Sequence, residues 1–265
     1  MTETVTPISI PFPDDVSARP RLRLTLAPIR LRISAADQAE WLSGSFTDPT
    51  GQMPLTVQTD GANVRVTSNK KVTAFRKFKA PVLELKISTR RPFALSMDLG
   101  ASDQTQVDLG GIPITEADIK IGAGQATFGF SSPNPHEMDT FALKAGAADL
   151  TLTGLGNSGA RKLDIDGGAA SVAIDFGGPL SRDLDATIRT GMTAAEVTVP
   201  KTTAARVRTK TALAGVNVGD GFTVKDGAFS TLAFIAGQQP VLTIDLQSAL
   251  GSVALKIDDS IALPA

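Results

Sequence analysis

The only histidine of the chain is the residue best suited to acid–base chemistry. His136 lies in a polar segment with two prolines, close to two acids and two serines. Glu137 or Asp139 could orient the imidazole ring, and Ser131 or Ser132 could act as a nucleophile, as in a hydrolase. Nothing in the sequence places these groups within reach of one another, and the alternative is a solvated loop without a catalytic role. We therefore expect a loop here and no catalytic residue.

Three aspartates around a pair of glycines are the second candidate. Asp164 and Asp166 precede Gly167-Gly168, and Asp175 follows them. Aspartates in glycine-rich turns resemble calcium-binding β-roll repeats, but the tandem nonapeptide of those repeats is absent. In a strand Asp164 and Asp166 would share one face, so they are also the carboxylate pair that a glycoside hydrolase would need. We expect instead solvent-facing residues of an amphipathic strand, with no bound metal and no cofactor.

Two further segments could bind anions. Gly122-Ala123-Gly124 resembles a phosphate-binding loop, but strands are expected on both sides, so the helix N-terminus that would hold a phosphate is missing. A basic segment at residues 70–79 could contact nucleic acid or another anionic polymer, or could be a solvated face above two buried phenylalanines. We expect no nucleic-acid partner and no small-molecule substrate, and the basic segment stays an open candidate. Its residues are Lys70, Lys71, Phe75, Arg76, Lys77, Phe78 and Lys79.

Composition excludes several other kinds of chemistry. The 265 residues include 26 Lys and Arg, 27 Asp and Glu, 1 His and no Cys or Tyr, and the net charge is −1. Without cysteine there is no disulfide, no thiol nucleophile and no cysteine-ligated metal, and a single histidine cannot form a zinc-binding cluster. A nearly neutral chain has no overall field that would attract nucleic acid or an anionic membrane.

The location of the protein is predicted from what the sequence lacks. Residues 1–13 contain no basic residue followed by a long apolar run, so they do not predict a secretory signal. No apolar stretch approaches the ~18 residues of a membrane span. We therefore expect a cytoplasmic protein without a membrane span, and an extracytoplasmic location remains open.

The elements that must position these residues are predicted to be short β-strands. Apolar residues fall at every second position in many runs, which indicates one buried and one solvated face. Glycines such as Gly122 and Gly146 separate the runs, so we expect them between strands. Only residues 35–42 show a helical pattern, with Ser34 as N-cap and Gly44 as stop. The alternating runs are 21–26, 29–33, 63–66, 82–87, 148–153, 163–166, 171–176, 196–199 and 205–209, with turns expected at 60–61 and 68–69.

A unit of two short strands around a Gly/Ala corner recurs along the chain. The unit containing Phe141 and Leu150 overlies the unit containing Leu163 and Val172, 22 residues later. Such repeats are typical of a β-solenoid, in which stacked coils share one core. We predict an all-β, single-stranded β-solenoid with coils of about 22 residues, and a β-sandwich is the alternative. The apolar residues after each corner are Val107, Phe128, Leu150, Val172, Val197 and Val216, and residues 244–255 repeat the frame once more.

The first ninety residues are less regular than the rest. We predict that residues 1–90 form an N-terminal cap with the first strands, and that residues 91–265 form the repeat. Terminal repeats are atypical because they must shield the open end of the core, so one continuous domain is expected. A separate N-terminal domain with a boundary near Arg91-Pro92 is the alternative.

The repeat also carries a family resemblance. Residues 141–157 and 163–178 contain a glycine–small–acidic unit followed by Leu-x-Leu, a Gly-Leu…Asn link, and a second unit that ends in Asp-Phe-Gly-Gly. This pattern resembles the LiaF-like, toast-rack domains of bacterial cell-envelope-response proteins and the related bacterial adhesin-like domains, over about residues 90–220. The resemblance implies a β-solenoid-like fold, a part in envelope-stress sensing for many members, and no catalytic residues.

The expected function follows from these elements. Short, even coils have flat faces and open ends but little room for a cleft, which favours a non-enzymatic structural or protein-interaction domain. We expect a protein partner or self-association, linked to the bacterial cell-envelope response or to adhesion. The alternative is a carbohydrate-active enzyme or polysaccharide-binding protein on a β-helix, with Asp164 and Asp166 as its carboxylates. An aromatic content of 5% without tyrosine argues against that alternative.

Overall fold

A computed structural model describes residues 3–15, 17–51, 53–69, 79–168 and 171–259, and these residues form an all-β protein. The strands in chain order are β1 (Thr4–Ile10), β2 (Arg21–Ala27), β3 (Arg30–Ala36), β4 (Leu42–Asp48), β5 (Thr56–Asp60), β6 (Asn63–Asn69), β7 (Val82–Ser88), β8 (Phe93–Asp108), β9 (Ile114–Gly129), β10 (Met138–Thr153), β11 (Ala160–Gly167), β12 (Val172–Asp175), β13 (Leu184–Pro200), β14 (Ala204–Val218), β15 (Phe222–Lys225), β16 (Ala228–Thr231) and β17 (Val241–Asp258). The short helices are η1 (Leu155–Ser158) and α1 (Leu232–Ile235).

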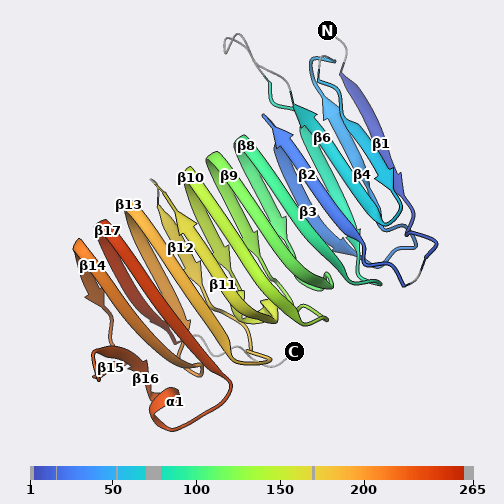
Figure 1. Cartoon of the computed structure of the whole chain (residues 1–265). Helices are drawn as coiled ribbons and strands as arrows, with labels where there is room; N and C mark the ends of the chain where they lie inside the picture. The colour runs from blue at the N-terminus through green and yellow to red at the C-terminus, as the bar shows by residue number, and fades with distance from the viewer. Residues whose placement is uncertain (1–2, 16, 52, 70–78, 169–170, 260–265) are drawn as a thin grey trace.

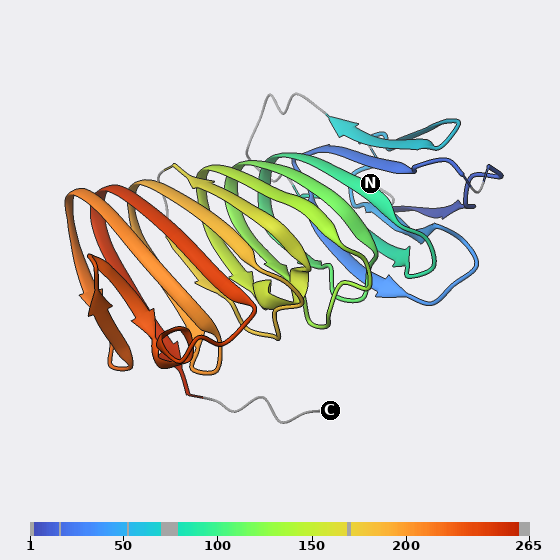
Figure 2. The same cartoon turned by 60° about the horizontal axis from the view of Figure 1, so that its bottom comes forward.

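Six long strands form the centre of the molecule. β8, β9, β10, β13, β14 and β17 have 15 to 18 residues each, and each bends near its middle into an arch. The arches stand side by side in parallel (Figure 1, Figure 2). The prediction that Gly122 and Gly146 separate short strands is therefore wrong, because both lie inside a single bent strand. A glycine at the bend lets the backbone turn without leaving the hydrogen-bonded ladder.

The repeat predicted from the sequence is visible in the strand register. Phe141 lies beside Leu163, and Leu150 lies beside Val172, as the overlay requires. The spacing is not constant, because Phe128 lies beside Leu152 and not beside Leu150. A shift of two residues keeps the same face of a strand buried, so the pattern tolerates it. One ladder inside the core consists of Val107, Phe128, Leu152, Ile174, Val197 and Leu255.

The C-terminal arches do not follow chain order. β13 pairs with β17, and β14 pairs with the far side of β17, so the last long strand is inserted between two earlier ones. The copy of the sequence frame at residues 244–255 therefore lies between the copies around Val197 and Val216, although it follows both in the chain. The connection through β15, β16 and α1 leads the chain back (Figure 1). As a result β14, and not the chain end, closes the stack.

The N-terminal part builds the first arch from two separate strands. β2 pairs with the first half of β8, and β3 pairs with its second half.

The helix expected at residues 35–42 is absent: β3 runs to Ala36, and a strand begins at Leu42. β7 supplies partners to both strands, parallel to β3 and antiparallel to β4, and Trp41 is fully buried between them. Sheet pairing thus overrides a weak helical pattern. The turn expected at residues 68–69 is likewise strand, within β6.

A single hydrophobic core runs through the stack. Buried side chains from Ile8 to Leu255 belong to one connected cluster, and it includes residues on both sides of residue 90. Trp41 lies at the N-terminal end of this core, between Phe12, whose ring centroid is 6.4 Å away, and Phe93, at 5.7 Å. The division into residues 1–90 and 91–265 stays a prediction.

Candidate functional site

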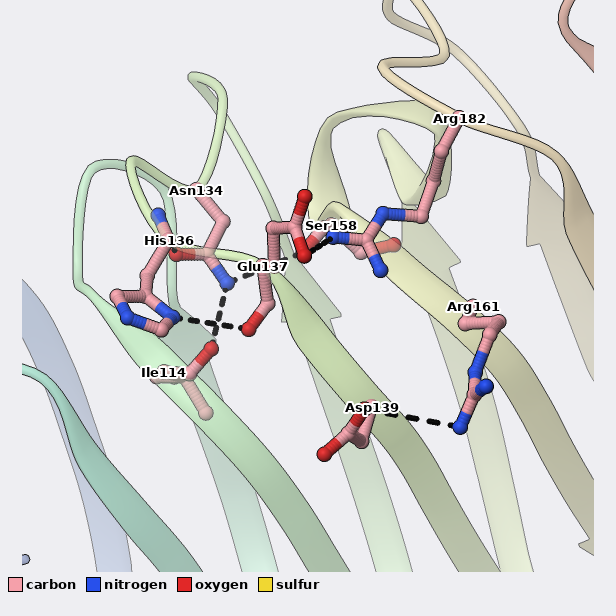
Figure 3. A network of polar contacts seen from close by, with 8 residues as sticks. All are labelled: Ile114, Asn134, His136, Glu137, Asp139, Ser158, Arg161 and Arg182. Carbon is pink, nitrogen blue, oxygen red and sulfur yellow. Dashed lines mark hydrogen bonds and ion pairs between the residues drawn. The ribbon is translucent and has the colours of Figure 1, made fainter.

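The segment around His136 is a loop that closes one arch and leads into the next, between β9 and β10 (Figure 3). His136 Nδ1 lies 2.9 Å from the carbonyl oxygen of Glu137. The Glu137 carboxylate pairs with Arg182 at 2.6 Å, and Asp139 pairs with Arg161 at 3.7 Å. Both acids that could have oriented the imidazole are therefore engaged by arginines of later segments.

The two serines of this loop differ in their surroundings. Ser131 donates its hydroxyl to Asp108 Oδ2 at 2.6 Å and its backbone N–H to Oδ1 at 3.1 Å. Ser132 is exposed. Asn134 donates to the carbonyl oxygens of Ile114 (2.8 Å), at the start of β9, and Ser158 (3.1 Å), at the end of η1 (Figure 3). This asparagine was missed by sequence reasoning, although its position between two prolines marks a constrained turn.

The aspartate pair is brought together as predicted, but around an arginine. Asp164 and Asp166 share the outer face of β11, and Arg189 of β13 pairs with Asp164 and lies 3.9 Å from Asp166. Asp175 accepts the backbone N–H groups of Gly177 and Gly154 at 3.0 and 3.1 Å. Asp164 and Asp166 thus neutralise the charge of Arg189, and Asp175 accepts hydrogen bonds from two backbone N–H groups. Among the described residues no three acidic, histidine or cysteine side chains converge on a possible metal position.

A neighbouring aspartate shows the same structural use. Asp149 of β10 accepts the Ser171 hydroxyl at 2.6 Å and the Ser171 N–H at 3.3 Å. These two hydrogen bonds favour the charged form and hold the pKa of Asp149 below its usual value.

The two anion-binding candidates have different outcomes. Gly122 and Gly124 lie within β9 and have strand on both sides, so no helix N-terminus adjoins them. Residues 70–78 of the basic segment lie outside the described residues, and Lys79 is exposed.

A hollow of about 870 Å³ lies over the outer surface of β3, β4, β7, β8 and β9. Its wall combines hydroxyls, such as Ser43 and Ser45, with the Arg32–Glu84 ion pair at 3.1 Å. None of its described lining residues is aromatic, so it offers no stacking surface for a sugar ring.

The C-terminal end of the stack is the most distinctive surface. β14 pairs with β17 along one side. On its other side β16 pairs only with Arg206 and Val207, so from Arg208 to Val218 no described strand occupies the outer edge. An unpaired edge presents N–H and C=O groups that can pair with another chain.

Three exposed apolar side chains lie in register beside this edge. Met192 of β13 lies beside Leu250 of β17, and Leu250 lies beside Leu213 of β14. Their exposed fractions are 66%, 39% and 81%. In the earlier arches the corresponding corner is made of alanines, Ala101, Ala123 and Ala147. The apolar ridge, defined as Met192, Leu250 and Leu213, thus occurs only toward the end of the stack within the part of the chain that the structure describes. Sequence reasoning missed it because these residues fall at corner positions and not on a strand face.

Comparison with known proteins assigns the fold to a family. Residues 5–153, more than half of the chain, match the N-terminal domain of toast_rack, DUF2154. The chain therefore belongs to the toast-rack family, the family that its repeat with glycine corners resembles. The match extends across residue 90.

Solved structures of low sequence identity were also found. A "putative cell adhesion protein" of Clostridium sporogenes is 11% identical, with 97% of this chain and 100% of that chain covered and a TM-score of 0.49. A "putative adhesin" of Bacteroides fragilis is 9% identical, with 96% and 97% covered and a TM-score of 0.42. A comparison with curated proteins gave no match. No helix within the described residues is long and apolar enough to cross a membrane.

Proposed function

We propose that the chain is a non-enzymatic protein-interaction domain, a β-solenoid-like stack that associates end to end through β14. The observation that carries this proposal is the unpaired outer edge of β14 from Arg208 to Val218. Half-buried Val216 and Val218 lie at the same end and pack against the core, so the last arch is only partly covered. A partner strand would complete both the hydrogen-bond ladder and the core.

A second copy of the chain fits this edge. The midpoint of the unpaired segment 208–218 is Leu213, the most exposed large apolar residue in the described part of the chain. In an antiparallel pair centred there, Arg208 would lie opposite Val218, and Lys210 opposite Val216, so no like charges would face each other. A two-fold axis beside Leu213 would place the β14 strands of the two copies next to each other. It would also bring their two apolar ridges together, as in an isologous dimer.

Replacing Leu213 by aspartate tests this association. A charge at the centre of an apolar interface removes a contact and is buried without a partner, so we expect the dissociation constant to rise roughly 100-fold. The fold should be unaffected, because a surface substitution of this kind changes stability by about 0.5 kcal/mol or less. Sedimentation velocity over about 1 μM to 1 mM, the range of transient complexes, would measure the shift.

The matched control is Val5→Asp. Val5 is 59% exposed in β1, at the opposite end of the stack, so its variant should associate like the natural chain. A natural chain that is monomeric throughout the concentration range, or equal weakening by both substitutions, would contradict the proposal.

The carbohydrate-active alternative has less support. A glycoside hydrolase needs two carboxylates free to act on the sugar. Asp164 and Asp166 instead flank Arg189 on an outer face. We therefore retain the interaction domain as the proposed function.

A further inference from the structure

The near-zero net charge conceals a strong segregation of charge along the chain. Residues 19–91 contain 14 Lys and Arg against 5 Asp and Glu, whereas residues 92–265 contain 12 against 19. The first segment has a net charge of +9 and the second −7. Such a local excess attracts anions even when the whole molecule is neutral. The strands of the positive segment lie at the end of the stack opposite β14 (Figure 1).

Three arginines of this segment lie together on one outer face. Arg21 and Arg23 alternate with buried Leu22 and Leu24 in β2, so both point away from the core. Arg65 of β6 is the direct strand partner of Arg23. Paired positions on neighbouring strands are about 5 Å apart, so the two guanidinium groups can reach one ligand.

These arginines have no ion pair with any described residue, unlike arginines elsewhere on the sheet. Arg32 is paired with Glu84 on the adjacent strand, and Arg189 lies between Asp164 and Asp166. Like charges at paired positions destabilise a sheet slightly, by about 0.2–1 kcal/mol. The direct pairing of Arg23 with Arg65 is thus unfavourable unless an anion neutralises it.

The arginines also line a hollow of about 540 Å³. Most of its other lining residues are polar, and its one acid, Asp60, leaves the three arginines in excess. Arginine presents a planar fork of donors that binds phosphate in a bidentate manner, which lysine cannot do. The remaining lining residues are Gln58, Thr59, Asn63 and Val64.

We propose that Arg21, Arg23 and Arg65 form a binding site for a phosphate group. The site lies away from the β14 edge, so it does not depend on the proposed association. Two arginines hold the phosphate oxygens from neighbouring strands, and Arg21 adds a third cation two residues along β2. The phosphate can belong to a lipid headgroup or to a soluble molecule.

The test compares the natural chain with Arg23→Gln and Arg65→Gln. Isothermal titration with inorganic phosphate, at an ionic strength held constant with chloride, should show binding to the natural chain that is weakened at least tenfold in each variant. Arg161→Gln, at an exposed arginine of β11 that lines neither this hollow nor the β14 edge, is the matched control and should bind like the natural chain. Without phosphate, the thermal midpoint of Arg23→Gln and Arg65→Gln should be equal to or above that of the natural chain, because like-charge repulsion is relieved.

Vesicles distinguish the two phosphate sources. Cosedimentation with phosphatidylglycerol-containing vesicles but not with pure phosphatidylcholine vesicles, lost in Arg23→Gln, would assign the site to an anionic lipid headgroup. Binding of inorganic phosphate without vesicle binding would assign it to a soluble phosphate. The proposal is overturned if the natural chain binds neither probe, or if Arg161→Gln weakens binding as much as Arg23→Gln.

Discussion

Replacing Phe128 by alanine is expected to lower the free energy of unfolding by about 3–5 kcal/mol, the usual cost of removing a buried aromatic ring. Phe128 is fully buried, and its strand neighbours Val107 and Leu152 continue the same internal ladder. Neighbouring arches cannot close the resulting cavity without losing their register, because each is fixed by its own hydrogen bonds. Urea unfolding followed by circular dichroism would measure the loss.

The comparison for this substitution is Leu213→Ala. Leu213 is 81% exposed, so in dilute solution its truncation should change stability by no more than about 0.5 kcal/mol. A loss below about 1 kcal/mol for Phe128→Ala would mean that the internal ladder does not stabilise the stack as argued.

Gly124→Ala is expected to destabilise the chain by about 2–4 kcal/mol, because backbone strain and a steric clash act together. Gly124 has φ +120° at the bend of β9, and a Cβ there would lie 1.7 Å from the carbonyl oxygen of Ser102. Ser102 cannot retreat easily, since its buried hydroxyl bonds the Ile29 carbonyl oxygen at 2.7 Å and lies 2.8 Å from Thr105 Oγ1. The thermal unfolding midpoint should fall accordingly.

Gly215→Ala provides the matched control for the bend. Gly215 lies near the bend of β14, where an added Cβ would meet no atom within 4 Å. We expect unchanged or slightly higher stability, because alanine loses less backbone entropy on folding than glycine does. Equal destabilisation by both substitutions would show that glycine is needed for flexibility at every bend, and not for close approach between arches.

The all-β fold was predictable because alternation of apolar residues is a local signal. Runs such as 163–166 are strands with the predicted buried face, and the overlay of Phe141 on Leu163 gives the observed strand partners. The bends were misread because glycine marks both a turn between strands and a corner within one. Only the pairing of β9 with its neighbours shows that Gly122 is the second case.

The order of the last arches could not be deduced from the repeat. The frame at residues 244–255 fits a place beside either β13 or β14, since each offers the same alternating face. The connection through β15, β16 and α1 decides between them, and its sequence has no repeat pattern. The unpaired edge of β14 depends on this choice, so it could not be foreseen.

Sequence spacing predicts which candidate site residues share a strand face, but not which distant residues lie beside them. Asp164 and Asp166 share a face, as period-two alternation requires, but their partner Arg189 lies 23 or more residues away in the sequence. The arginines Arg23 and Arg65 are separated by 42 residues and meet only through the β2–β6 pairing. Net charge gave no hint of them, because the later acidic arches balance the basic N-terminal strands.

The most direct test of end-to-end association is amide hydrogen exchange of the segment 208–218 as a function of protein concentration. Strand addition predicts that these amides exchange more slowly at a concentration where the chain is associated than in dilute solution, with the largest change around Leu213. In Leu213→Asp the rates should be the same at both concentrations. Exchange in residues 208–218 that is independent of concentration while the chain associates would contradict the account, because it would place the interface elsewhere.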